Sequence, residues 1–182
     1  ILSYTLGNLY RDSLAIGRLV ENAEKMLKVH EELVQLSKGE IQESDVSDLD
    51  VLRITESNQI ITKKNNIDLP NQISNTALKE VILQYFIWID YLEFITLSQN
   101  KFVAEHFRPF FREKKLLNYE ENSATAKILN RERFLIEFKN EEFKQLLFDS
   151  RGKSTVLKRI GLQIQSKNAE LLQAVRKYLD EQ

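Results

Sequence analysis

The 182-residue chain combines 42% hydrophobic with 29% charged residues, which is typical of a folded domain with a sizeable core and excludes disorder throughout. Five glycines and two prolines are too few for the many turns of a β-sandwich or barrel. The absence of cysteine excludes disulfide bonds, thiolate metal sites and a cysteine nucleophile. A net charge of −1 gives no overall attraction to nucleic acid or anionic lipid.

The charges are unevenly distributed along the chain. Residues 1–70 carry a net charge of −4, whereas residues 123–182 carry +4. Helices of opposite charge attract each other when they lie side by side. The distribution therefore predicts two complementary helix surfaces within one bundle.

A heptad pattern runs through the N-terminal segment, because apolar or small residues recur at alternating spacings of three and four. The seam consists of Leu2, Leu6, Leu9, Ser13, Ile16, Val20, Ala23, Leu27, His30 and Val34, and Leu14, Leu19, Met26 and Leu33 widen it. With Gly39 as the expected stop, the pattern predicts a helix over residues 3–38, roughly 50 Å long. A helix of this length must be one arm of a hairpin or bundle.

Residues 39–75 form an irregular connection in this interpretation. Ser47, followed by two aspartates, predicts a short helix over residues 48–55, since a hydroxyl cap and early acids suit a helix N-terminus. Residues 59–69 are expected to form a loop, with an extended piece at residues 60–62, ahead of Pro70.

The next helix is expected to start at Ser74 or Asn75 and to be the most buried one. It carries two neighbouring apolar stripes, Leu78, Ile82, Tyr85, Ile89 and Leu92 beside Val81, Trp88, Ile95 and Phe102. The apolar run from residue 81 to 97 contains Gln84, Asp90 and Glu93, so buried core explains it better than a transmembrane helix. Pro109 should break or kink this helix, with a new turn over residues 108–117.

A further helical piece is expected over residues 123–138, and Asn140 should cap the last helix. The stripe of that helix consists of Phe143, Leu147, Leu157, Ile164, Leu171 and Val175, interrupted at Ser150, Ser154, Gly161 and Asn168. The sequence thus predicts an all-α protein, an antiparallel helical bundle of three long helices with short intervening helices. We expect a single domain over residues 1–182.

Two short motifs resemble functional sites and fail on their spacing. Residues 152–155 read Gly-Lys-Ser-Thr, as at the end of a phosphate-binding loop, but Leu147 stands where such a loop needs its first glycine. His30 begins a zinc-protease pattern, but the second histidine is replaced by Val34. No catalytic, cofactor-binding or metal-binding residue is predicted.

Two further groups of residues have both a structural and a functional interpretation. Phenylalanines alternate with cations over residues 107–115, which occurs in nucleic-acid and membrane binding but more often marks core rings beside solvated cations. A ligand pocket between helices is the alternative role for Tyr85, Trp88, His106 and His30, and a facing histidine pair can also bind a metal or sense pH. Core packing is the preferred interpretation for both groups.

Several segments carry a resemblance that spans most of the chain. They are Tyr4, Leu6, Leu9 and Asp12, then residues 73–80 with Tyr85 and Phe86, then Pro109 and Phe110, and finally Glu142, Phe143 and residues 171–179. In this order they resemble an uncharacterised family of bacterial single-pass membrane proteins, whose transmembrane helix precedes a helical extracytoplasmic domain of unknown function. The resemblance implies a membrane helix upstream of Ile1.

The expected function is therefore a non-enzymatic interaction or sensing domain on the extracytoplasmic, periplasmic side of a bacterial membrane. Its partner is expected to be an unidentified protein or a second copy of the chain, with no cofactor and no nucleic acid. Two alternatives stay open: a small-ligand-binding helical module, and a cytoplasmic helical adaptor or nucleic-acid binder that uses the basic C-terminal third. Retention on heparin that falls steeply with salt would mark the nucleic-acid binder.

Overall fold

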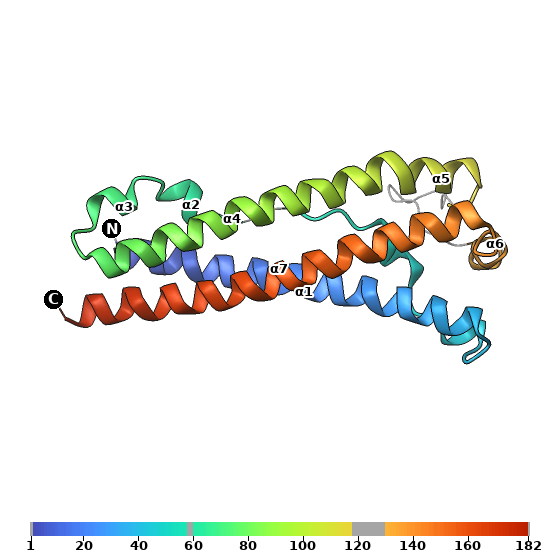
Figure 1. Ribbon diagram of the computed structural model, residues 1–182, viewed down its shortest axis with the longest axis horizontal. Coiled ribbons are helices and arrows are strands. Elements are labelled where there is room, and N and C mark those ends of the chain that lie inside the picture. Colours follow the sequence, from blue (N-terminus) through green and yellow to red (C-terminus); the bar gives the residue numbers. More distant parts are fainter. Residues whose placement is uncertain (1, 58–59, 118–129, 182) are drawn as a thin grey trace, which may run out of the picture. The chain divides into compact units, whose positions relative to one another are not determined.

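Three long helices dominate the computed structural model, which describes residues 2–57, 60–117 and 130–181 (Figure 1). They are α1 (Leu2–Ser37), α4 (Thr76–Phe102) and α7 (Glu141–Asp180). Shorter elements connect them: η1 (Glu43–Asp45), η2 (Leu49–Arg53), α2 (Thr62–Asn65), α3 (Leu69–Gln72), the π-helical turn η3 (Val103–Phe107), α5 (Arg108–Glu113) and α6 (Arg131–Glu137). The described ranges contain no strand, so the predicted all-α class is confirmed.

The chain forms two compact units. The first comprises Ile1–Glu21, Ser57–Thr96 and Leu157–Gln182, and the second comprises Asn22–Glu56 and Leu97–Val156. Each unit is assembled from segments that are far apart in the sequence. The single domain expected over residues 1–182 stays a prediction.

In the first unit, the three long helices do not all alternate in direction. The start of α1 lies beside the end of α7, since Leu2 and Tyr178 line the same small pocket. The start of α4 also lies beside the end of α7, where Leu78 and Tyr178 line another. Helix α7 is therefore antiparallel to both partners, while α1 and α4 run parallel because the connection over residues 38–75 returns the chain to the start of the unit (Figure 1).

An aromatic cluster forms the core of the second unit. Its rings are Phe102, Phe107, Phe110, Phe111, Phe134 and Phe143, all buried, and neighbouring centroids lie 4.7–6.4 Å apart. Burial of one such ring stabilises a fold by about 1.5–3 kcal/mol. Of the cations in this segment, Arg108, Arg112 and Lys115 are exposed, as the core interpretation predicts, whereas Lys114 is half-buried, with its Nζ 5.7 Å from the centroid of the Phe110 ring.

Helix α1 ends where the sequence predicts, at a glycine. Gly39 has φ +75°, and its N–H donates to the Leu36 carbonyl at 3.0 Å. The Glu40 N–H donates to the Gln35 carbonyl at 3.0 Å, which completes a Schellman motif. Only glycine adopts this backbone conformation without strain.

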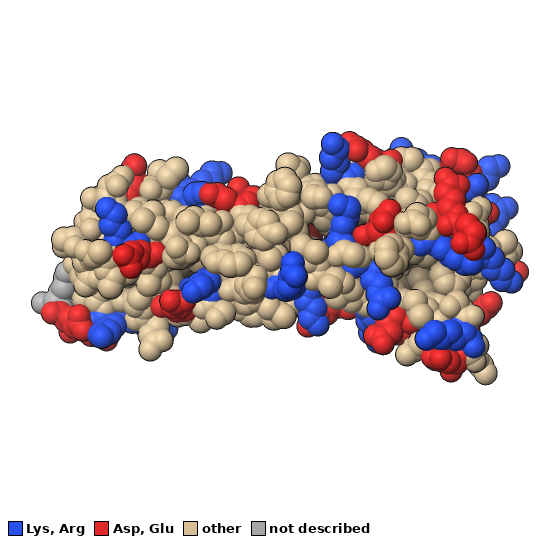
Figure 2. All heavy atoms as spheres, in the orientation of Figure 1, with Lys and Arg blue, Asp and Glu red and all other residues tan. Residues whose placement is uncertain are grey.

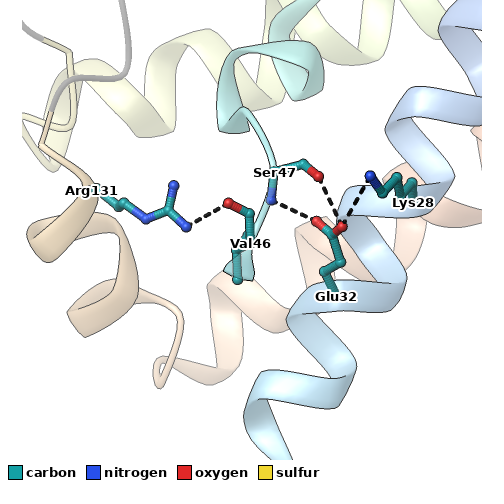
Figure 3. Close-up of polar contacts among 5 residues, drawn as sticks. All are labelled: Lys28, Glu32, Val46, Ser47 and Arg131. Carbon is teal, nitrogen blue, oxygen red and sulfur yellow. Dashed lines mark hydrogen bonds and ion pairs between the residues drawn. The ribbon is translucent and has the colours of Figure 1, made fainter. Parts of the chain in front are cut away.

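Polar contacts hold the first part of the connection that follows, at Val46 and Ser47, against α1 and α6 within the second unit. The Glu32 carboxylate accepts hydrogen bonds from the Ser47 N–H at 2.7 Å and from its hydroxyl at 2.8 Å, and Lys28 lies 3.6 Å away (Figure 3). Arg131 donates to the Val46 carbonyl at 2.6 Å. Ser47 was predicted to cap a helix at 48–55. Instead Asp48 caps the 3-10 helix η2, because Glu32 already engages Ser47.

Pro109 does not break the helical segment, although a break was one of the two outcomes expected from the sequence. Its missing N–H would leave a carbonyl unpaired in a regular α-helix. The π-helical turn just before it absorbs this defect, and the Arg108 N–H donates to the Val103 carbonyl, five residues back. The helical segment continues from Thr76 to Glu113.

Two other expectations change in the structure. The loop expected at 59–69 contains α2 and the start of α3, and Pro70 lies in the first turn of α3, where no N–H is needed. The helix expected at 123–138 is α6 from residue 131 onward, and residues 123–129 lie outside the described residues. Asn75 and Asn140 cap α4 and α7 as expected, accepting from Leu78 N–H and Glu142 N–H at 2.9 Å each.

The buried stripe of α1 includes polar residues that the predicted seam omitted. Thr5 and Asp12 are fully buried one heptad apart, whereas Leu14 is 66% exposed. The prediction for Leu14 was wrong because leucine was assigned to the core by residue type alone.

Helix α4 is buried on one side rather than all round. Its first predicted stripe is buried, but Leu83, Ile87, Tyr91 and Phe94 on the opposite side are 41–65% exposed. Figure 2 shows few charged side chains over the middle of α4 on the face in view. By length and composition, the segment Thr76–Glu113 is apolar enough to cross a membrane, a test that core helices also pass.

Candidate functional site

The four residues predicted to line a pocket are divided between the two units. Tyr85 and Trp88 belong to the first unit, His30 and His106 to the second. His106 is exposed, with its ring 5.2 Å from that of Phe102, while His30 is 3% exposed. Among the described residues, no three metal-ligating side chains cluster.

Tyr85 belongs to a buried polar network in the first unit. Its hydroxyl donates to the Asp12 carboxylate at 3.0 Å and accepts from the Asn168 amide at 3.0 Å. Asp12 also accepts from the Ile61 N–H at 2.7 Å and the Thr62 N–H at 3.2 Å. The network thus ties residues from α1, α4 and α7 to the connection that precedes α4.

Burial raises the pKa of Asp12, although its hydrogen bonds act in the opposite direction. Burial and the Asp12 charge raise the pKa of Tyr85 as well. The carboxylate and the phenol are hydrogen-bonded to each other, and neither lines any of the four pockets that we describe. We therefore interpret this network as structural, and Trp88, half-buried and edge-on to Tyr91, as a packing residue.

Glu56 is a second partly buried carboxyl. Burial raises its pKa, and Asn22 donates to one of its oxygens at 3.3 Å. The Asn100 amide accepts from the Glu56 N–H and donates to its carbonyl, both at 2.7 Å. These hydrogen bonds attach the connection at Glu56 to Asn100 of α4. None of the three residues lines a pocket that we describe.

The second unit contains a small, largely apolar pocket beside His30, with a volume of about 220 Å³. Leu33 and Val34 from α1, Phe138 after α6, and Leu147 and Phe148 from α7 form its apolar lining. Phe148 is 71% exposed, an unusually large fraction for an aromatic side chain. Phe148 therefore lines the pocket while most of its surface is exposed to solvent.

His30 lies at the base of this pocket as a neutral, buried imidazole. Its Nε2 lies 3.1 Å from the Ser150 hydroxyl. Burial, together with the charge of Arg151, lowers the pKa of His30 to about 4. The ring is therefore uncharged at neutral pH.

Two cations stand at the edge of the same pocket. Lys144 forms an exposed ion pair with Glu141 at 2.7 Å, whereas Arg151 has no ion-pair partner among the described residues. An exposed ion pair of this kind contributes little energy and exchanges easily. The arrangement therefore offers one free and one weakly engaged cation to a ligand.

Of the residues that line this pocket, only His30 was predicted from the sequence to line a ligand pocket. Arg151 begins the basic segment of the last helix, whose GKST motif lies within α7: Ser154 is fully buried and Lys153 donates to the Ser98 hydroxyl at 2.9 Å. Lys144, Leu147, Phe148 and Arg151 are spaced three and four residues apart, which places them on one face of the helix and could have indicated that they act together. This signal was ambiguous because most amphipathic helices have the same spacing.

The first unit also has surface pockets, but their chemistry is different. One of about 410 Å³ is lined largely by polar groups, including Asn65, Asn66, Asp68 and Gln72. Asp68 and the amide carbonyl oxygens present acceptors, so this pocket lacks the combination of apolar lining and cations.

These features define an all-α helical protein with a small apolar pocket edged by cations. No protein-family model, no curated protein and no solved structure matches the chain. The function therefore has to be inferred from the fold and the pocket.

Proposed function

We propose that the chain is a non-enzymatic sensing domain of a membrane-anchored protein and that it binds a small molecule in the His30 pocket. The observation that carries the proposal is the pocket itself, in which an apolar lining lies directly beside polar and charged groups. Small-molecule sites in proteins combine these two features. The resemblance described above supports placement on the extracytoplasmic side of a bacterial membrane.

Ligand binding is tested by native mass spectrometry of the purified chain, with Val34→Trp as the variant that fills the mouth of the pocket. We expect an added mass that is lost on denaturation and absent in Val34→Trp. Val34 is 37% exposed, so the larger side chain is tolerated without rebuilding the core. An added mass that persists in the variant would show that the ligand binds elsewhere.

Membrane anchoring is tested separately on the full-length gene product. A segment of about twenty apolar residues flanked by Lys or Arg upstream of Ile1 would support it. Protease protection in spheroplasts then reports the side of the membrane. A cytoplasmic location would overturn the placement but not the ligand site.

Self-association is a second candidate function, favoured by the exposed side of α4. We define the α4 stripe as Leu83, Ile87, Tyr91 and Phe94, whose spacings of three and four residues suit helix–helix pairing. Given roughly 200 Å² for a fully exposed large side chain, the stripe exposes roughly 400 Å². Two copies would bury roughly 800 Å² of it, and a polar rim brings this close to the smallest stable interfaces.

A second copy suits this surface better than a bilayer does. Glu80 and Glu93 are exposed beside the stripe, and acidic side chains repel anionic lipids. Sedimentation equilibrium should show a dimer that Phe94→Glu dissociates, with Glu93→Gln as the control that keeps it. A monomer at all concentrations, or cosedimentation with neutral vesicles instead, would contradict self-association.

A further inference from the structure

We infer that the ligand of the His30 pocket is a single-chain carboxylate of medium length, with its hydrocarbon against Leu33, Leu147 and Phe148 and its carboxylate at Arg151. This inference rests on the proposed ligand-binding function and adds the chemical class. It follows from the charge, the size and the lining of the pocket.

The charge of the pocket selects an anion. Arg151 and Lys144 both line it, and none of its lining residues in the described part of the chain is acidic. His30 is buried and uncharged at neutral pH, so a hydrocarbon chain beside it desolvates no charge. A guanidinium without an ion-pair partner can form two parallel hydrogen bonds with a carboxylate, which a lysine cannot do.

The size of the pocket limits the apolar part. An apolar cavity of roughly 150 Å³ holds benzene, and drug-sized ligands need roughly 300 Å³ or more. At about 220 Å³, this pocket takes a chain of moderate length rather than a sterol or a nucleotide. Octanoate, with its eight carbons, is a suitable probe.

The exposure of Phe148 is consistent with such an occupant. An aromatic side chain that is 71% exposed in the free protein gains apolar contacts when a hydrocarbon lies against it. Lys144 gives up only an exposed ion pair with Glu141, whose carboxylate is 87% exposed, if it turns toward the bound carboxylate.

The test compares three probes that share an eight-carbon chain and differ in their head group. Octanoate, 1-octanol and octyltrimethylammonium are titrated into the whole chain labelled at Leu and Val methyl groups, and binding is followed by NMR. The methyl groups of Leu33, Val34 and Leu147 report the pocket, while those of Leu78 and Leu171 in the first unit serve as internal controls.

Removing the charge of Arg151 should weaken the binding of octanoate but not that of octanol. Arg151→Gln should raise the Kd for octanoate about tenfold, the effect of losing one charge-assisted contact, and leave the Kd for octanol unchanged. Arg159→Gln is the matched control, because Arg159 is exposed on the same helix and does not line the pocket. It removes the same net charge and should change neither Kd.

Different failures have different meanings. Equal affinity for octanoate and octanol, or equal effects of Arg151→Gln and Arg159→Gln, would overturn the carboxylate class and leave the ligand site standing. Preference for octyltrimethylammonium would overturn the class as well. If no probe shifts the pocket methyls, or if Val34→Trp does not abolish the shifts, the proposed ligand-binding function itself is wrong.

Discussion

Asp12 and His30 are the two buried ionisable side chains of α1, and the structure uses them differently. Asp12 accepts from two backbone N–H groups and from Tyr85, so its carboxylate organises the connection before α4. Among the described residues, His30 has only the Ser150 hydroxyl as a hydrogen-bond partner, and it lines the pocket. A buried polar group is costly unless it is hydrogen-bonded, which makes both residues sensitive to substitution.

Replacement of Asp12 by asparagine should destabilise the protein. The amide keeps one acceptor oxygen, and its NH₂ group would face backbone donors that the carboxylate now satisfies. We expect the free energy of unfolding to fall by about 1–3 kcal/mol in urea denaturation. Asp90→Asn is the control, because Asp90 is exposed and its pairing with Lys63 should contribute less than about 1 kcal/mol. Equal losses in the two variants would refute the role assigned to the network.

His30 should make stability depend on pH below neutrality. Its pKa falls from 6.5 in the unfolded chain to about 4 in the folded protein, so the unfolded chain binds more protons between these values. The stability contribution of His30 is therefore complete above pH 6.5 and is lost as the pH falls to 4, by about 3 kcal/mol in total.

The variant His30→Gln isolates this contribution, because glutamine still offers a hydrogen bond to Ser150 but does not titrate. Asp12 has the opposite sign: its raised pKa means that stability falls as the pH rises above the unfolded value of 3.8. Since Asp12 is the same in both proteins, the wild type minus His30→Gln difference removes it. Parallel stability curves between pH 4 and 6.5 would contradict a depressed His30 pKa.

At the scale of the element, α7 shows how one helix places similar residues in different environments. Gly152 and Gly161 both lie within its 40 residues. A Cβ at Gly152 would meet no atom within 4 Å, whereas one at Gly161 would lie 2.7 Å from Cγ2 of Val20. Gly161 therefore permits the close approach of α1 and α7 in the first unit, and Gly152 has no such role.

The two glycines should respond to alanine with opposite signs. Gly152→Ala should stabilise the protein by about 0.5–1 kcal/mol, because alanine favours the helix and reduces the freedom of the unfolded chain. Gly161→Ala should destabilise it by about 1–3 kcal/mol through overpacking. Thermal denaturation measures both. The double variant Val20→Ala, Gly161→Ala should recover part of the loss, and a purely additive result would argue against the contact.

At the scale of the whole molecule, ligand binding should appear as thermal stabilisation, because a ligand that binds only the folded state shifts the unfolding equilibrium. At a concentration ten times its Kd, octanoate should add about 1.4 kcal/mol, which raises Tm by about 3–6 °C for a chain of this size. Octyltrimethylammonium at the same concentration should give a smaller shift or a decrease. A Tm shift that survives in Val34→Trp would not come from the pocket.

The sequence by itself determined the three long helices and most of their ends. Gly39, Asn75 and Asn140 mark helix boundaries through backbone chemistry that is local, and the stripe of α7 is fully recovered because 3.6-residue periodicity needs no partner to be read. Pro109 shows the limit of local rules, since a π-helical turn accommodates it within a continuing helical segment.

Only the tertiary structure decided which polar residues join the buried side of α1 and which side chains meet. Asp12 lies in the core because Ile61, Thr62 and Tyr85 satisfy its carboxylate, whereas Leu14, two residues further on, is exposed. Tyr85 and His30 belong to different units, while Arg151 and Phe148 join His30 at one pocket. Contacts between residues more than a hundred positions apart depend on how helices pack, which periodicity alone does not specify.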